Sequence, residues 1–178
     1  MGKDKVVISI GRQYGSGGRE IGRRLAEIFN IKFYDKELIT LAAKQSGFSE
    51  DVLKENDEKH NGSFLYSLVM GTYTGGDNLP LNHKLFLAQF DTIKKLAEEE
   101  SCVIIGRCAD YALEYNPNCV KAFIRADIDT RIKRAINEYG VNPETVEEKI
   151  KKIDKQRENY YNFYTGKKWG NMENYDIT

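Results

Sequence analysis

Short apolar runs alternate with longer amphipathic stretches along this chain. The runs are rich in β-branched and aromatic side chains, and they occupy residues 6–10, 31–35, 102–106 and 119–126. Short continuous apolar runs bounded by glycine or by charged residues are typical of buried parallel strands. The pattern therefore predicts four such strands.

The stretches between these runs have the spacing of amphipathic helices. Residues 20–30 place Ile21, Leu25 and Ile28 on one side and charged residues on the other. Similar spacing predicts further helices over 36–46, 82–100, 127–140 and 142–165.

Two of these helices carry recognisable capping residues. Asp129 or Thr130 is the expected N-cap of the helix that Gly140 closes. Asn142 is the expected N-cap of the helix that follows, with Pro143 in its first turn.

The order of the elements predicts the fold class. Strands that alternate with helices form parallel β-α-β units. We therefore expect an α/β fold with helices on both faces of a parallel sheet. Residues 47–82 interrupt the alternation with polar and turn-forming residues, which predicts a partly helical excursion followed by a loop. The tail predicts the start of another strand, so we expect a last strand and helix beyond Thr178.

Composition and charge narrow the class of protein. The 178 residues suit one compact domain with small insertions. Lys+Arg and Asp+Glu are both 27, so net charge gives no attraction to nucleic acid or to an anionic membrane. Three cysteines without a CxxC pair argue against a disulfide framework and a structural zinc site. With no signal-peptide pattern and no run of roughly 20 apolar residues, a cytoplasmic location is expected.

A glycine-rich segment, GRQYGSGGRE at residues 11–20, joins the first predicted strand to the first predicted helix. Glycine lets the backbone adopt positive φ and approach a ligand closely. Consecutive N–H groups at a helix start then form a nest that binds anions. The order strand, glycine loop, helix predicts a phosphate-binding loop, or P-loop, whose pattern is GxxxxGK[ST]. The alternative is a tight turn that binds nothing.

The loop lacks the lysine of that pattern. Gly18 stands at the lysine position, and Arg19 comes next. Glu20, one residue beyond the Ser/Thr of the pattern, stands where we expect a magnesium-binding Ser or Thr. Arg19 is the first candidate to replace the lysine, because a guanidinium forks onto phosphate oxygens. Arg12 is the second candidate.

A dinucleotide-binding site, with the pattern GxGxxG, is a further alternative. Gly15, Gly17 and Gly22 approximate this pattern with two residues too many. Asp35, after the second strand, would be its acidic residue.

Charged residues follow two of the predicted strands. Asp35, Arg107 and Asp110 all come at the carboxyl edge of the sheet, where ligands bind in α/β folds. Together they are candidates for holding the phosphate and the polar groups of an acceptor. The alternatives are a helix N-cap at Asp35 and a surface ion pair between Arg107 and Asp110.

Two later helices carry arginines at helical spacing. Arg131 and Arg134 are three residues apart, as are Asp154 and Arg157. Phosphoryl transfer needs positive charge around the migrating group, and a mobile lobe can supply it. The alternative is a solvated, charged helix surface.

The order of these parts resembles that of nucleoside monophosphate kinases, and most closely the cytidylate kinase-like family of P-loop proteins. The motifs that carry the resemblance are ISIGRQYGSGGREIGRRLAE with FYDKELI, VIIGRCADY, RADIDTRIKRA and DKQRENYY. The resemblance implies a three-layer P-loop fold with two insertions. Its expected parts are a core over about 1–35, 101–130 and 170–178, an acceptor lobe over about 36–100, and a lid over about 131–165.

The resemblance also implies roles for residues. The donor phosphates would be held by Gly15, Ser16, Gly17, Gly18, Arg19 and Glu20. The acceptor would face Asp35, Arg107 and Asp110. The transferred phosphoryl group would be surrounded by Arg19, Arg131, Arg134 and Arg157. ATP with Mg²⁺ is the implied donor, CMP or dCMP the first acceptor, and no metal site built from protein ligands alone is predicted.

Two departures from the family pattern keep a second function open. Cytidylate kinases carry lysine where Gly18 stands and a Ser/Thr-type residue where Glu20 stands. Residues 47–82 also hold no motif that matches their base-reading lobe. The alternative to a kinase is a nucleotide-binding or regulatory module without catalysis. Small nucleotides are the expected partners in both cases, and the oligomeric state is left open.

Overall fold

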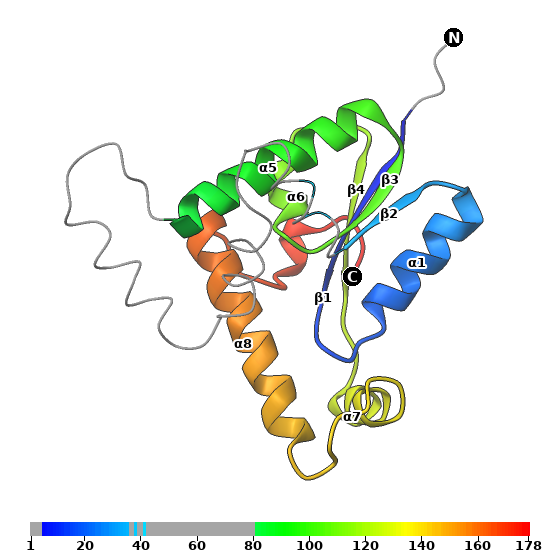
Figure 1. Cartoon of the computed structure of the whole chain (residues 1–178), viewed down its shortest axis with the longest axis vertical. Coiled ribbons are helices and arrows are strands. Elements are labelled where there is room, and N and C mark those ends of the chain that lie inside the picture. The colour runs from blue at the N-terminus through cyan, green and yellow to red at the C-terminus, as the bar shows by residue number, and fades with distance from the viewer. Residues whose placement is uncertain (1–4, 36–37, 39–40, 42–80) are drawn as a thin grey trace, which may run out of the picture. The chain divides into compact units, whose positions relative to one another are not determined.

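The computed structural model describes residues 5–35, 38, 41 and 81–178 (Figure 1). The chain divides into two compact units, one formed by Met1–Asp35 with Leu96–Thr178 and the other by Lys36–Lys95. The first unit contains the sheet and all the candidate site residues. The predicted helix over 36–46 and the predicted excursion over 47–82 lie almost wholly outside the described residues.

The strands and helices alternate as the sequence predicts. The described elements are β1 (Val7–Arg12), α1 (Gly18–Phe29), β2 (Lys32–Tyr34), α5 (Leu81–Glu99), β3 (Cys102–Ile105), α6 (Ala109–Ala112), β4 (Cys119–Ile124), α7 (Ile128–Asn137), α8 (Val146–Thr165) and the 3-10 helix η1 (Met172–Asn174). All four predicted strands are confirmed. They form one sheet in the order β2-β3-β1-β4, and every neighbouring pair is parallel.

One face of the sheet is buried beneath α1. Ile8 and Ile10 of β1 pack with Val103 and Ile105 of β3, and Ala26 of α1 completes this core. Alternate residues of a strand point to the same face, so these isoleucines and valines line one side. Truncating one of them to alanine is expected to cost about 2–5 kcal/mol of stability.

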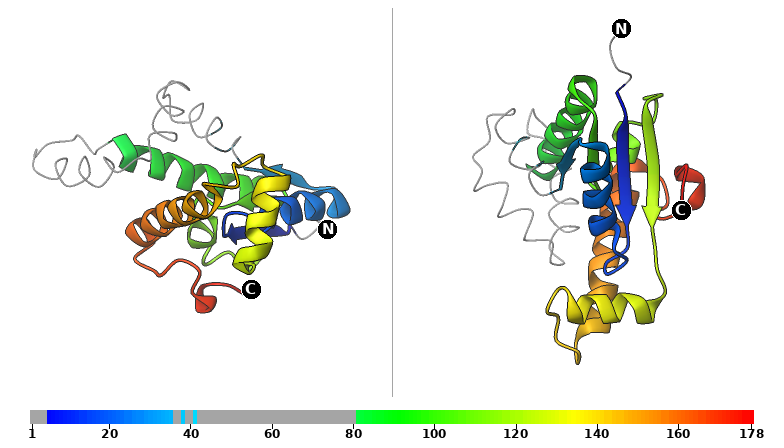
Figure 2. Two further views of the ribbon diagram at one scale, coloured as in Figure 1. Left: turned by 90° about the horizontal axis from the view of Figure 1, so that it is seen from below. Right: turned by 90° about the vertical axis from the view of Figure 1, so that its right-hand side faces the viewer.

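The opposite face is covered by the second half of the chain. In Figures 1 and 2, α1 and α8 lie on opposite sides of the sheet. Phe123 of β4 packs against the rings of Trp169 and Tyr175 on this side. Ile177 forms a parallel bridge with Ala122, which confirms the start of a further strand in the tail. The strand and helix expected beyond Thr178 stay a prediction.

The predicted N-cap of α7 is wrong. Asp127 caps this helix, because its side chain accepts a hydrogen bond of 2.8 Å from the backbone N–H of Thr130. Asp129 and Thr130 already lie inside the first turn. The apolar spacing was correct, and the cap position shifted because several polar residues in a row can all accept such a bond.

The predicted start of α8 is also wrong. The helix begins at Val146 rather than at Asn142. The side chain of Asn142 accepts a hydrogen bond from the N–H of Glu144, and its carbonyl accepts one from the N–H of Thr145. Asn142 therefore closes a turn of its own before the helix, as asparagine often does.

No helix in the described part of the chain combines the length and the apolar character of a bilayer span. Cys102, Cys108 and Cys119 are buried free thiols. The boundaries predicted for the acceptor lobe and the lid stay predictions.

Candidate phosphate-binding site

The glycine loop, residues 13–17, leaves β1 and turns directly into α1. Gly15 and Gly17 adopt φ values of 76° and 84°, which favour glycine. Space is equally restrictive, since a Cβ at Gly15 would lie 2.7 Å from the carbonyl oxygen of Arg131. Both glycines are therefore required by the local geometry.

The loop presents the start of α1 as an anion site. Gly17 is the N-cap, and no side chain caps the helix there. The first N–H groups of the helix are those of Gly18, Arg19 and Glu20. They lie at the positive end of the helix dipole, where phosphate groups bind in many proteins.

Three arginines from α7 and α8 hold the carbonyl groups of this segment. Arg131 Nε donates to Tyr14 O at 2.8 Å, and Arg134 Nη1 donates to Gly15 O at 3.1 Å. Arg157 Nη1 donates to Arg12 O at 3.0 Å. The carbonyl oxygens of this segment therefore point toward the three arginines. Residues more than a hundred positions away along the chain thus fix the conformation of the loop.

Asp154 of α8 joins the glycine loop to Arg131 of α7. Its Oδ1 accepts a 2.8 Å hydrogen bond from the backbone N–H of Tyr14, and its Oδ2 pairs with Arg131 Nη2. Both partners of this ion pair are largely shielded from solvent, with side chains 8% and 16% exposed. Removing one charge from such a pair leaves the other uncompensated.

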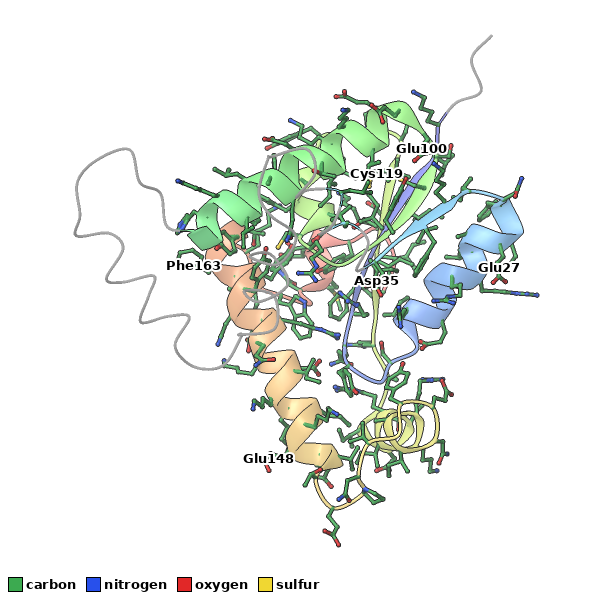
Figure 3. The ribbon with its side chains drawn as sticks, in the orientation of Figure 1. Glu27, Asp35, Glu100, Cys119, Glu148 and Phe163 are labelled. Carbon is green, nitrogen blue, oxygen red and sulfur yellow. The ribbon has the colours of Figure 1, made fainter. Side chains whose placement is uncertain are left out.

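A second acidic residue, Asp35, lies at the end of β2 among cations (Figure 3). Its Oδ2 is 2.7 Å from Arg19 Nε, and its Oδ1 is 3.9 Å from Arg12 Nη2. Asp35 is buried, whereas the side chain of Arg19 is 47% exposed. The structure thus brings together the predicted acceptor residue and the two predicted substitutes for the P-loop lysine.

Arg12 lies within electrostatic range of three other arginines, and the four are here called the guanidinium cluster: Arg12, Arg19, Arg107 and Arg157. Burial, followed by the charge of Arg157, lowers the pKa of Arg12 from its ordinary value of 12.5 to about 9. Burial likewise lowers the pKa of Arg157. A bound anion would relieve the repulsion between these two charges.

Arg107 is positioned by an unusual stretch of backbone. Gly106, Arg107 and Cys108 adopt φ values of 69°, 57° and 55°, so three consecutive residues are left-handed. For a residue other than glycine this conformation costs of order 1 kcal/mol or more, and it clusters at functional sites. The turn brings Arg107 from the end of β3 into the guanidinium cluster.

Asp110 belongs to a different group of side chains. It is 6% exposed, and its Oδ2 accepts a 2.7 Å hydrogen bond from Tyr161 Oη on α8. Burial raises its pKa, partly offset by the bond from Tyr161. Its role in acceptor binding stays a prediction, as do the catalytic roles of Arg131 and Arg134.

Glu20 is held by a residue that sequence reasoning missed. Tyr139 Oη donates to Glu20 Oε1 at 2.9 Å, and the Tyr139 ring meets that of Tyr14 edge-on at 5.6 Å. Tyr14 also packs on the α7–α8 core. The only sequence signal for this contact was an aromatic residue inside a glycine loop, where small residues are usual.

Comparisons with known proteins identify the family of this chain. A family model described as "Cytidylate kinase-like family" matches residues 7–178. The match covers nearly the whole chain and confirms the resemblance drawn from the order of the motifs. Among curated protein sequences, none matches the chain significantly.

Solved structures extend the comparison to the fold. An uncharacterized protein from Eubacterium ventriosum ATCC 27560 has a TM-score of 0.70 and 35% identity, over 97% of this chain and 86% of that one. Shikimate kinase from Bacteroides thetaiotaomicron has a TM-score of 0.52 and 16% identity, over 97% and 84%. Shikimate kinase from Acinetobacter baumannii, in complex with shikimate, has a TM-score of 0.51 and 13% identity, over 98% and 82%. The last two show a shared fold alone, and the predicted three-layer P-loop fold is confirmed.

Proposed function

Because the chain belongs to the cytidylate kinase-like family, we propose that it transfers the terminal phosphoryl group of ATP to a nucleoside monophosphate or to a similar small phosphate-bearing acceptor. CMP and dCMP are the first acceptors to test. The observation that carries the proposal is the guanidinium cluster beside the glycine loop, because a site with this excess of positive charge suits a ligand with several phosphate groups.

The proposed chemistry rests on positioning and charge neutralisation. In phosphoryl transfer these effects provide most of the catalysis, and no strong protein base is required. The N–H groups at the start of α1 would hold the donor phosphates. Arg107 would bind the acceptor phosphate, and the Asp35 carboxylate would orient a polar group of the acceptor. Arg157 would balance charge on the group in transfer.

The residues present fit a magnesium ion that arrives with the nucleotide. The described residues contain no group of three or more His, Cys, Asp or Glu side chains placed for a metal. Mg²⁺ needs few protein ligands, because it usually binds one or two carboxylates, several waters and the substrate phosphates. Glu20 on the first turn of α1 would be such a carboxylate. When bound, the ion neutralises charge on the donor phosphates.

A binding module without catalysis is the second candidate function. Gly18 favours it, because a P-loop normally carries lysine at that position. Such a module would hold nucleotides in the same nest of N–H groups.

The deciding experiment measures ADP formation by the purified protein with ATP and Mg²⁺. The acceptors are CMP, dCMP, UMP, AMP and GMP, with shikimate as an acceptor that carries no phosphate. We expect ADP to form only when a nucleoside monophosphate is present. The variant Arg107→Met should raise the acceptor KM by about 10- to 100-fold, because a charge-assisted hydrogen bond is lost.

A matched control separates this loss from a general loss of charge. Arg24 on α1 is 74% exposed in its side chain and pairs only loosely with Glu27, at 3.5 Å. Arg24→Met should leave the acceptor KM unchanged. The kinase proposal would be wrong if no ADP formed with any acceptor while ATP still raised the Tm of the protein. The binding module would then replace it.

A further inference from the structure

The positions of two P-loop residues are exchanged in this chain. When Gly18 is aligned with the lysine of GxxxxGK[ST], the first glycine of the pattern falls at position 12. The chain has arginine at position 12 and glycine at position 18. The cation is thus absent at its usual place and present where the pattern has no side chain.

Packing makes these two positions mutually exclusive. A Cβ added at Gly18 would lie 2.6 Å from the Cβ of Arg12 and 3.2 Å from the Cβ of Ile124. A Cβ is fixed to its backbone, so neither neighbour can rotate out of the way. A lysine at position 18 therefore needs glycine at position 12, and an arginine at position 12 needs glycine at position 18.

The guanidinium of Arg12 is held in a defined place. A Cβ at Gly106 would overlap Arg12 Nη1, so the end of β3 must be glycine for this arginine to lie there. On the β2 side, Arg12 Nη2 is 3.9 Å from the carboxylate of Asp35. The side chain thus runs from the end of β1 across the carboxyl edge of the sheet.

Among the residues that the structure describes, the charge of Arg12 is only partly compensated. Asp35 forms its shorter contact, 2.7 Å, with Arg19 rather than with Arg12. The charges of Arg157, Arg107 and Arg19 all disfavour the charged form of Arg12, as does its burial. A cation that is partly shielded from solvent among like charges gains more from an anion than a more exposed one does. The side chain of Arg12 is 22% exposed, against 47% for Arg19. Arg19, with half of its side chain in solvent and its Nε on Asp35, has less to gain.

We propose that Arg12 is the phosphate-binding cation of this site, and that it replaces the P-loop lysine from the end of β1 instead of from the first turn of α1. The ligand class is a chain of phosphate groups, as in a nucleoside triphosphate. The inference rests on the proposed function only in taking the glycine loop as a phosphate site. It also reverses the order of the two candidates that the sequence suggested.

The test measures binding of inorganic triphosphate and of ATP by calorimetry, without any acceptor. Arg12→Met should weaken binding by about 10- to 100-fold, as expected for loss of a charge-assisted contact. Arg12→Lys should recover part of the affinity, because it keeps the charge without the fork. Arg19→Met should weaken binding less, and the exposed control Arg24→Met should bind as the wild type does.

A position swap tests the exclusion directly. Gly18→Lys alone should lower the Tm, since its Cβ has no room beside Arg12. The double variant Arg12→Gly with Gly18→Lys should bind triphosphate more tightly than Arg12→Gly alone. The Tm of each variant, measured without ligand, shows whether the protein is folded.

The outcomes separate this inference from the proposed kinase activity. If a folded Arg12→Met variant bound triphosphate like the wild type, or if Arg19→Met caused the larger loss, Arg12 would not be the cation. ADP formation in the acceptor assay would stand in that case. Conversely, triphosphate binding that depends on Arg12 in a protein that never forms ADP would support the inference and refute the kinase.

Discussion

Asp110 illustrates how burial acts on one carboxyl group. The side chain is almost fully buried, and its partner Tyr161 donates a hydrogen bond to it. Burial nevertheless dominates, and the pKa of Asp110 is raised. The folded protein therefore binds a proton at this carboxyl at pH values where the unfolded chain has released it.

This shift predicts a pH dependence of stability. A raised pKa means that the folded state binds more protons, so the free energy of unfolding falls as pH rises from about 3.9, the ordinary Asp value, through the raised pKa. Asp110→Asn keeps an oxygen acceptor for Tyr161 and cannot ionise. Urea unfolding between about pH 4 and about pH 7 should give a stability difference, variant minus wild type, that grows with pH.

Other carboxyl groups titrate in both proteins, so the comparison uses only the difference between them. A difference that stayed flat across this range would show that Asp110 keeps an ordinary pKa.

At the scale of elements, α7 and α8 form a hairpin with a small core of its own, made of Ala135, Val141, Val146 and Ile150. The glycine loop is attached to this hairpin by the packing of Tyr14 on its core and by polar contacts. The chief polar contacts are the Arg131–Asp154 pair and the bonds both residues make to Tyr14.

Breaking this attachment should be costly. Asp154→Asn leaves the shielded charge of Arg131 without its carboxylate, which typically costs about 3–5 kcal/mol. Arg131→Met should cost less, because Arg157 Nη1 stays 4.0 Å from Asp154 Oδ1. The double variant should cost less than the sum, because both members of the pair are gone. Chemical denaturation of the single and double variants measures the coupling. Arg24→Met, which removes an exposed pair, should change stability by no more than about 0.5 kcal/mol.

Additive costs in that cycle would show that the two side chains act independently. Triphosphate affinity of the same variants should fall as well, because Arg131 and Asp154 hold the backbone of Tyr14 beside the nest.

At the scale of the whole molecule, the reactivity of the three thiols can measure how often the unit that contains the sheet unfolds. Cys102, Cys108 and Cys119 are 0%, 4% and 9% exposed, and they come from β3, the N-terminus of α6 and β4. Burial raises the pKa of all three thiols, to about 12 for Cys102 and about 11 for Cys119. Thiolate, the reactive form, is therefore scarce near neutral pH.

The folded protein should thus react with a thiol reagent such as DTNB only when this unit opens. All three cysteines should be modified with one rate constant at about pH 8, and at once in urea. A bound phosphate ligand should slow the native reaction by stabilising the folded state. One thiol that reacted rapidly in the native protein would show that its strand or helix opens separately.

Local patterns in the sequence predicted most of the elements and part of the site. Runs such as VVISI and CVIIG indicate strands that are buried on both faces of the sheet. Glycines between a strand and a helix indicate a backbone with positive φ. These are properties of a few neighbouring residues, so they can be predicted without knowledge of the fold. The same local information misplaced the caps of α7 and α8, because several polar residues near each helix start can accept a bond from a backbone N–H. Asp127 does so at the start of α7, whereas Asn142 does so in a turn before α8.

The sequence by itself determined that this is a parallel α/β protein with a glycine loop and arginines at the ends of its elements. Only the tertiary structure decided the strand order β2-β3-β1-β4, the attachment of Asp154 to Tyr14, and the exclusion of a side chain at Gly18 by Arg12. The physical reason is the distance along the chain between the residues that interact. Periodicity records which side of an element is buried, whereas distances between remote side chains exist only once the elements have packed.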